Sequence, residues 1–446
     1  MLACRANAGI AAENVAVVVN GDSADSVTVA AEYAKLRDIP TSNIVTLHNL
    51  SATEEMDVDH FRDEILKPVL ESLRTRGVIS HVTCITYSVA IPYAINVGAD
   101  MQGRKFPKFA TPVASINGLT YLCDLVLKKD PNYLRLDTNL NAQISDPSYS
   151  PDPKRPHPHY LYSTVLGVTA GRGNTLEEVL RSIRRSAAAD FTAPKGVIYF
   201  ERNGDVRSRT REWGFESAVQ ELDRHGVQGV VEQGALPTGH PDVAGTMMGT
   251  QDFKWATSSS SILPGAICEN LTSYGAIFRP GVGQTPCTDF IRFGASGTSG
   301  TVTEPYAIQQ KFPTPFIQVQ YAKGFTLVES FYQSVSGPYQ LLIIGDPLCR
   351  PWAKMVKLEV RKTITGQPIR GNLQFSPTTS PPTPISKYEV FVDGILYPVV
   401  ALGTKLTLNT ARLEPGAHLI SVIATASNGP ESSYRVAFRI QVAGSR

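Results

Sequence analysis

The chain contains 446 residues, more than a single hydrophobic core usually organises, so we expect two or three domains. It carries 42 Lys and Arg against 40 Asp and Glu, and the basic residues are spread along the sequence. This argues against a nucleic acid partner, because phosphate binding needs a concentrated basic surface. No apolar run approaches the roughly eighteen residues of a transmembrane helix, so we expect no membrane span.

Strand-like and helix-like segments alternate from the N-terminus. Residues 14–20 (NVAVVVN) form an apolar run of strand length, and 22–37 carry apolar residues at helical spacing. A second strand is predicted at 44–47, a second helix at 57–76 and a third strand at 81–87. Strands that are apolar throughout and separated by amphipathic helices are typically buried on both faces. The pattern predicts an α/β fold whose mostly parallel sheet has helices on both faces.

The alternation stops between about 98 and 160, a Pro-rich excursion around one helix predicted at 116–127. Beyond it, DFIRF (289–293) is predicted as a strand. The Gly-rich stretch that follows, 294–300, is predicted as a tight connection between strand and loop. Other predicted helices lie at 175–189, 211–225 and 325–335, and other strands at 160–168, 196–200, 229–232, 243–248, 262–268 and 339–344.

The composition changes after Trp352. Segments such as KYEVFVDGILYPV and HLISVIATA alternate apolar and polar residues, with turns such as VDG and SNGP between them. This pattern predicts an all-β sandwich. We assign 1–353 to the α/β domain and 354–446 to the sandwich. Six residues should point into the core of the sandwich: Val360, Phe375, Val390, Ile420, Val422 and Phe438.

The sequence shows no pattern typical of a metal or cofactor site. Its six cysteines form no C-x-x-C pair, and no G-x-x-x-x-G-K-[ST] phosphate loop occurs. Cys84, Cys123 and Cys268 lie in apolar stretches, where we expect buried free thiols rather than disulfides. We therefore expect no cofactor and no metal ion.

Cys268 is the candidate nucleophile, at the end of the apolar run SILPGAIC and before the turn ENLTSYG. A thiol becomes reactive where a base or a positive dipole favours the thiolate. At the exit of a buried strand it can equally be a small core side chain. In that case its surroundings should raise its pKa above the free value of about 8.5.

Five segments in order resemble the caspase-like cysteine peptidases of the gingipain type (clan CD). They are VAGTMMGTQDFKW, SILPGAICEN, DFIRFGASGTSGTVTEPY, YAKGFTLVESFYQSV and LLIIGDPLCRPW. More specifically, residues 14–352 resemble an uncharacterised bacterial family with that fold, through PGAICENLTSYG, GASGTSGTVTEPY and IIGDPLCRPW. The segment LEPGAHLISVIATASNG is similar to a hairpin of immunoglobulin-like and fibronectin type III modules of bacterial surface proteins. The resemblance implies a caspase-like α/β domain followed by an immunoglobulin-like domain.

The chain departs from the peptidase pattern at one place. Gingipain-type peptidases carry Gly-His-Gly at the end of the strand before the cysteine strand, whereas 248–251 here are MGTQ. The nearest histidine is His240, in an upstream loop. Two hypotheses follow. The first is a non-catalytic binding or structural protein, a pseudoenzyme that has lost its dyad; the second is a cysteine endopeptidase with Cys268 as nucleophile and His240 as base.

Both functions would use the ends of the same two strands. Backbone N–H groups of Glu269 or Gly249 would form the oxyanion hole of a peptidase. In a binding protein, a protein or peptide partner would contact the same region. We expect its binding residues to be Glu269, Asn270, Gly249, Thr250 and Asp252.

The N-terminus, MLACRANAGIAAENV, shows no charged leader followed by an apolar core. The resemblance to surface proteins nevertheless favours a secreted or cell-surface protein whose leader is absent from this sequence. A cytoplasmic location is the alternative.

Overall fold

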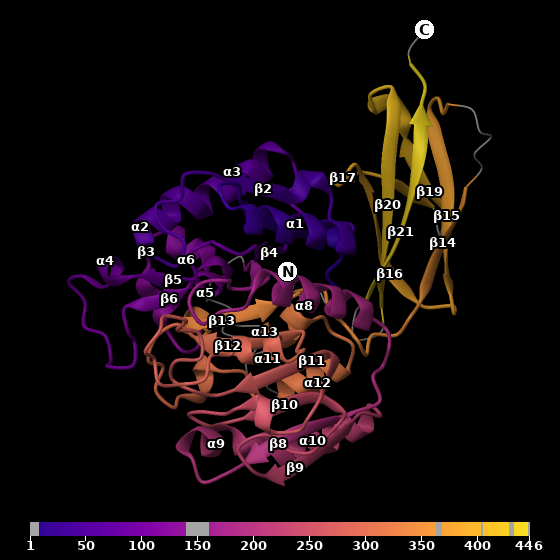
Figure 1. Cartoon of the computed structure of the whole chain (residues 1–446). Helices are drawn as coiled ribbons and strands as arrows, with labels where there is room; N and C mark the ends of the chain where they lie inside the picture. The colour runs from indigo at the N-terminus through magenta and orange to yellow at the C-terminus, as the bar shows by residue number, and fades with distance from the viewer. Residues whose placement is uncertain (1–8, 140–159, 363–367, 403–404, 428–431, 445–446) are drawn as a thin grey trace.

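A computed structural model describes residues 9–139, 160–362, 368–402, 405–427 and 432–444 (Figure 1). Its largest element is a single sheet of ten strands. In spatial order these are β2 (Ile44–Leu47), β1 (Val15–Asn20), β4 (Cys84–Tyr87), β7 (Tyr162–Val165), β13 (Leu341–Gly345), β12 (Gly297–Thr301), β11 (Ile262–Asn270), β10 (Val243–Met248), β8 (Val197–Arg202) and β9 (Gln228–Gln233).

The sheet is parallel except between β12 and β13. These two strands run antiparallel, with Gly297 opposite Gly345 and Thr301 opposite Leu341. The strands from β2 to β13 therefore run one way and those from β12 to β9 run the other. The prediction of one large, mostly parallel sheet is confirmed, and β1, β4 and β13 all belong to it.

The central strands of the sheet are buried along their whole length. Every residue of β1, β4 and β13 is buried, which agrees with their uninterrupted apolar sequences. Polar residues occur only at their ends or carry a hydrogen bond; the Thr86 hydroxyl, for example, lies 2.8 Å from that of Thr164 on β7. Burial therefore explains why these strands could be recognised in the sequence.

Local capping signals determine where the long helices begin. The Ser23 side chain accepts a hydrogen bond from Ser26 N at the start of α1 (Ala24–Arg37). Thr175 and Glu178 form a capping box at the start of α8 (Leu176–Ala189). The other α-helices in the described residues are α2 (Val58–His60), α3 (Lys67–Thr75), α4 (Gly98–Met101), α5 (Ile116–Tyr121), α6 (Cys123–Leu127), α9 (Val206–Arg211), α10 (Phe215–Arg224), α11 (Thr288–Arg292), α12 (Phe316–Ala322) and α13 (Leu327–Tyr332). A π-helical stretch lies at Phe61–Leu66.

Two predictions around the Gly-rich stretch were wrong. Most of DFIRF lies in helix α11, and residues 297–300 of the Gly-rich stretch belong to strand β12. A short apolar run cannot be assigned to strand or helix by periodicity alone. Small residues suit β12 because its neighbours approach closely: a Cβ on Gly297 would lie 2.3 Å from Leu327 Cδ1, and one on Gly300 would lie 2.5 Å from the carbonyl carbon of Gly275.

A separate small sheet joins β3 (Glu55–Asp57), which precedes β4 in the chain, to β5 (Ala94–Asn96) and β6 (Val113–Ser115), which follow it. The single helix predicted at 116–127 is interrupted at Leu122, where ψ changes to 28°, giving α5 and α6. Residues 140–159 of the predicted excursion lie outside the described part of the chain.

The C-terminal part consists of two antiparallel four-stranded sheets. One contains β14 (Lys357–Lys362), β15 (Asn372–Ser380), β19 (Lys405–Asn409) and β18 (Val400–Leu402); the other contains β17 (Ile395–Tyr397), β16 (Ile385–Val392), β20 (Gly416–Ala426) and β21 (Ser433–Val442). Of the six residues predicted to point inward, Phe375, Val390, Ile420 and Val422 are buried in the shared core, and Val360 and Phe438 are half-buried and pack against it. Phe375 and Phe438 meet edge to face with ring centroids 6.0 Å apart.

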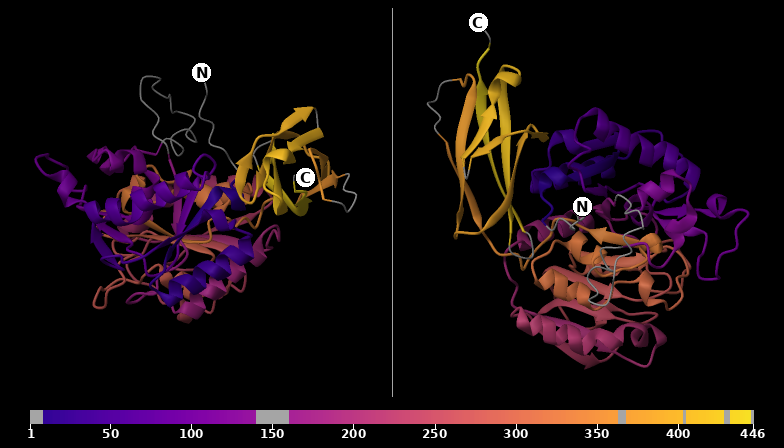
Figure 2. Two further views of the ribbon diagram at one scale, coloured as in Figure 1. Left: turned by 90° about the horizontal axis from the view of Figure 1, so that it is seen from above. Right: turned by 180° about the vertical axis from the view of Figure 1, so that it is seen from behind.

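The sandwich packs against one side of the α/β part (Figure 2). Phe391 and Ile423 of the sandwich form a small buried cluster with Ala11, and the Phe391 side chain is fully buried. Beside it, Arg435 Nε lies 2.7 Å from Oε1 of the buried Glu13. The sandwich thus has its own core and, in addition, a mixed apolar and ionic contact with the rest of the chain.

Because its core is separate, the isolated segment 355–446 should fold, and its circular dichroism and NMR dispersion should be those of a β-sandwich. It should also self-associate in gel filtration, because Phe391 and Ile423 lose their cover. Phe391→Ser should restore a monomer, whereas Phe375→Ser should unfold the module, since Phe375 lies in its core. An unfolded segment 355–446 would contradict independent folding.

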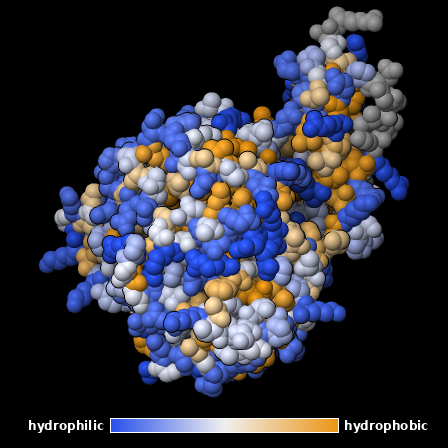
Figure 3. Space-filling view, viewed as in Figure 1, coloured by the Kyte–Doolittle hydropathy of each residue, from blue (hydrophilic) through white to orange (hydrophobic). Residues whose placement is uncertain are grey.

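Hydrophilic side chains dominate the face of the α/β part seen in Figure 3, with apolar side chains scattered among them. Within the described residues, no helix is long and apolar enough to cross a membrane.

Candidate functional site

Cys268 lies inside the sheet and not at an accessible edge. It is in β11, paired with Thr246 of β10, and none of its surface is exposed. Burial, followed by the nearby Glu269, raises the pKa of its thiol well above the usual range. A neutral, inaccessible thiol is a poor nucleophile.

The His240 ring has partners other than Cys268. Its Nε2 lies 3.1 Å from Glu232 Oε2, and the ring stacks on Tyr199 with centroids 4.2 Å apart. Glu232 and Tyr199 belong to β9 and β8, and β10 lies between β8 and the strand of Cys268. No hydrogen bond joins the His240 ring to Cys268, so the two residues do not form a dyad in this conformation.

The strand ends expected to bind a substrate or partner are occupied by the protein itself. A Cβ on Gly249 would lie 2.2 Å from Ser208 N, because α9 packs against this glycine. The Asn270 side chain accepts a bond from Thr250 N at 2.9 Å and donates one to Thr250 O at 3.1 Å. These contacts clamp the end of β10 to the end of β11.

Glu269 is part of a buried polar pair. Its Oε2 accepts a bond from Ser299 Oγ at 2.8 Å, and Arg211, which is fully buried, donates to Met248 O nearby. Burial raises the pKa of Glu269 to about 7, against the attraction of Arg211. Both side chains are fully buried, so Glu269 lies beneath the surface and not where a partner could contact it without rearrangement.

Asp252 has a different environment from the other expected residues. It lines a shallow cavity of about 460 Å³ together with Arg172 and Arg292. Both arginines are held by the protein: Arg172 Nη1 donates to Gln284 O at 2.8 Å, and Arg292 Nη2 donates to Gly173 O at 2.9 Å. The cavity is open, but the guanidinium groups of both arginines already donate hydrogen bonds to backbone carbonyls.

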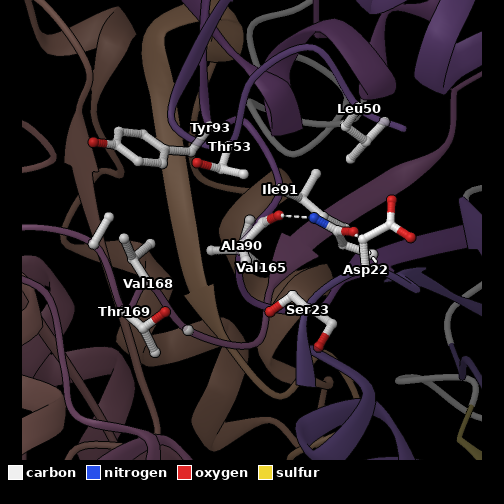
Figure 4. A pocket seen from close by; sticks show the side chains of 14 residues that line it. Asp22, Ser23, Leu50, Thr53, Ala90, Ile91, Tyr93, Val165, Val168 and Thr169 are labelled. Carbon is white, nitrogen blue, oxygen red and sulfur yellow. Dashed lines mark hydrogen bonds between the residues drawn. The ribbon is translucent and has the colours of Figure 1, made fainter. Parts of the chain in front are cut away.

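A deeper cleft lies in the other half of the sheet (Figure 4). It has a volume of about 430 Å³ and is lined by residues at and after the carboxyl ends of three adjacent parallel strands, among them Asn20, Ser88 and Val165. β1 pairs with β2 on one side and with β4 on the other. The order in which the chain adds strands to the sheet therefore reverses at β1. In open α/β sheets, ligands bind at such switch points. We call this cavity the switch-point cleft.

Asn20 holds two walls of the switch-point cleft together. Its Nδ2 donates to Ala90 O at 2.8 Å, and its Oδ1 accepts from Asp22 N at 3.0 Å. Ala90 has a φ of 56°, a left-handed conformation that is uncommon for a residue with a Cβ. Such conformations concentrate at ligand sites, where surrounding structure maintains them.

Our sequence reasoning did not select the switch-point cleft, although a signal was present. Short polar stretches follow the apolar runs at once, as in VAVVVN-GDS and CITY-S. The carboxyl ends of parallel strands meet at one edge, so these polar residues could have been grouped. Among the described residues, no group of His, Cys, Asp and Glu is arranged to hold a metal ion.

No protein-family model matches this chain, and no curated protein is similar enough in sequence to count as a relative. Fibronectin(III)-like modules of Clostridium thermocellum CbhA are 18% identical over 24% of this chain, which spans about half (53%) of their length, with a TM-score of 0.17. OgpA from Akkermansia muciniphila is 11% identical, over 56% of this chain and 94% of its own, with a TM-score of 0.20. The endo-beta-1,4-mannanase from Thermotoga petrophila is 10% identical over the whole of both chains, with a TM-score of 0.16. At TM-scores of 0.20 or below, these likenesses carry no argument about fold or activity.

Proposed function

We propose that this chain is a non-catalytic binding protein built on a caspase-like, gingipain-type α/β domain with helices on both faces of its sheet. One observation carries the proposal: Cys268 is fully buried, and burial raises its pKa. The placement of His240 supports it, because the ring contacts Glu232 of β9 and Tyr199 of β8 and makes no hydrogen bond to Cys268 of β11.

The occupied strand ends also favour binding at another place. α9 covers Gly249, and Asn270 clamps Thr250, so a protein or peptide chain laid across these ends would have to displace protein contacts. The switch-point cleft is open without such a rearrangement.

Thiol labelling tests the non-catalytic proposal. Under native conditions at pH 7, iodoacetamide should leave Cys268 unmodified for as long as it takes to label the denatured chain completely, as read by peptide mass spectrometry. His240→Ala should not change this result. Cys268→Ala should lower the free energy of unfolding by roughly 1 kcal/mol, through lost side-chain volume.

Rapid labelling of Cys268 below about pH 7 that disappears in His240→Ala would establish the cysteine endopeptidase instead. His225→Ala is the matched control, since His225 caps the C-terminus of α10, a helix that packs on β9 and α12. Labelling that is fast in both histidine variants would indicate an opened core and not a dyad.

We also propose that the protein acts outside the cytoplasm. The C-terminal all-β sandwich, similar in sequence to modules of bacterial surface proteins, supports this location. Fractionation of the producing cells, with an antibody against the sandwich, tests it. Recovery of the protein with cytoplasmic markers alone would contradict the proposal.

A further inference from the structure

We propose that the switch-point cleft binds a small organic amine, with the ammonium group at Asp22 and an apolar body against Leu50, Ile91 and Val168. This inference goes beyond the proposed function and does not depend on the state of Cys268. Figure 4 shows the arrangement: Asp22 lies on one side of the cleft, and Tyr93 and Val168 lie on the other.

The charge of the cleft selects a cation. Asp22 is the one charged residue among the fourteen that line it. His48 Nδ1 lies 2.8 Å from Asp22 Oδ1, and Asn49 N donates to Oδ2 at 2.6 Å. The bond with His48 lowers the pKa of Asp22, so its carboxylate is ionised at neutral pH. A carboxylate has about four acceptor positions, which leaves room for an ammonium donor.

An anion fits this cleft less well. Ser23 caps α1 at the edge of the cleft, and a helix N-terminus attracts negative charge. However, the Ser23 hydroxyl already accepts a bond from Ser26 N, and Asp25 sits in the first helical turn. Together with Asp22, these groups already compensate the partial positive charge at the N-terminus of α1. No Lys or Arg lines the cleft to hold an anion.

The remainder of the lining determines the size and polarity of the ligand. Leu50, Ile91 and Val168 are apolar lining residues on different sides of the cleft, and Tyr93 also lines it (Figure 4). A volume of about 430 Å³ is at the small end of the range for small-molecule sites. A bare metal ion would leave these apolar side chains without a contact, whereas an amine with a hydrocarbon or aromatic body can contact both them and the carboxylate.

The carboxylate that receives the amine is held in place before binding. A Cβ on Gly21 would lie 2.3 Å from His48 Cε1, so the absence of a side chain there lets His48 reach Asp22. The bond from Asp22 N to Asn20 fixes the backbone of the same turn. Preorganisation of this kind reduces the entropy lost on binding.

Phenethylamine and two isosteres, phenethyl alcohol and phenylacetate, test the proposal by calorimetric titration of the full chain. The amine should bind, the alcohol should bind severalfold more weakly, and phenylacetate should be weaker still. Asp22→Asn should weaken the amine by about fivefold or less and should leave the alcohol nearly unchanged, because the Asp22 carboxylate is half exposed and an exposed ion pair contributes about 1 kcal/mol or less.

The sandwich offers a matched control. Asp393 is also held by a histidine Nδ1 (His418, 2.6 Å) and by the N–H of the following residue (Leu419, 2.8 Å). Asp393→Asn should therefore remove the same type of carboxylate and leave amine binding unchanged. An equal loss in both variants would show that the effect is not local to the cleft and would overturn the proposal.

Two further measurements keep the test decisive if Asp22→Asn does not fold. Ala170→Trp should fill the cleft and abolish amine binding while the thermal midpoint is retained. Methyl NMR of the unaltered chain should show that the amine shifts Ile91 and Val168. No amine binding at millimolar concentration, equal binding of the alcohol, or shifts confined to other methyl groups would each overturn the assignment.

Discussion

Replacing Arg37 with methionine should lower the free energy of unfolding by about 3–5 kcal/mol, because it leaves buried carboxylates without their cation. Arg37 Nη1 donates to Asp190 Oδ2 at 2.5 Å, and its Nε donates to Asp346 Oδ2 at 2.7 Å. Asp346 is 1% exposed and also accepts a bond from Tyr33 OH. Methionine keeps the aliphatic bulk, so the loss reports the missing charge.

The defect of Arg37→Met should be smaller at pH 5 than at pH 8. Burial already raises the pKa of Asp346, and Arg37 opposes this increase. Without Arg37 the folded-state pKa rises further, so protonation relieves the variant at low pH and its stability falls as the pH rises. A loss that is the same at both pH values would show that the unpaired carboxylate is not its cause.

Urea denaturation followed by tryptophan fluorescence provides the measurement, since all three tryptophans precede the sandwich. Arg184→Met is the matched control. Arg184 on α8 pairs with Glu32 on α1 at 2.6 Å, but its side chain is 49% exposed. An exposed pair contributes about 1 kcal/mol or less. Equal losses in both variants would contradict the buried-ion argument.

The Arg37 cluster also explains one of the segments that carried the family resemblance. Asp346 belongs to LLIIGDPLCRPW, and its carboxylate joins the end of β13 to α1. In the sequence this aspartate could equally have been part of a site, because a motif does not reveal its partners. The structure gives it a buried ion pair that holds elements together.

The strands that the sequence predicted well are those whose own residues determine their burial. β10 has the predicted bounds, and β1 differs from its prediction by one residue, because both are apolar and buried on both faces. β12 was missed because its sequence, GTSGT, contains no apolar signal. Its strand conformation depends on close contact with Leu327 and Gly275, and both residues lie far from β12 in the sequence.

The sites differ in the same way. That Cys268 ends an apolar run could be seen in the sequence, but its complete burial depends on neighbouring strands and helices. The switch-point cleft brings together residues from Asn20 to Ala170, and only the strand order places them side by side. Sequence patterns predict elements, whereas a site between elements requires their spatial order.

A buried carboxyl in the other half of the sheet should make stability depend on pH. Glu201 of β8 is 1% exposed and lies opposite Glu232 of β9. Its Oε1 accepts no hydrogen bond from any described residue. Burial, and then repulsion by Glu232, raises the pKa of Glu201 to about 7. The protein therefore holds this group in an environment that favours its neutral form.

Glu201→Gln should stabilise the protein at pH 8 by about 3 kcal/mol and change little at pH 4.5. A carboxyl whose pKa is higher in the folded than in the unfolded chain contributes stability that is complete below the unfolded value of about 4.5 and is lost as the pH rises to about 7. Each pKa unit corresponds to about 1.4 kcal/mol. Glutamine stays neutral, and its amide can donate to Glu232, so urea midpoints at the two pH values should separate the variant from the unaltered chain.

Glu71→Gln, at an exposed position of α3, should move neither midpoint. If Glu201→Gln has the same effect at both pH values, the carboxylate is not forced to ionise in a buried site, and its neighbours must already stabilise the charge.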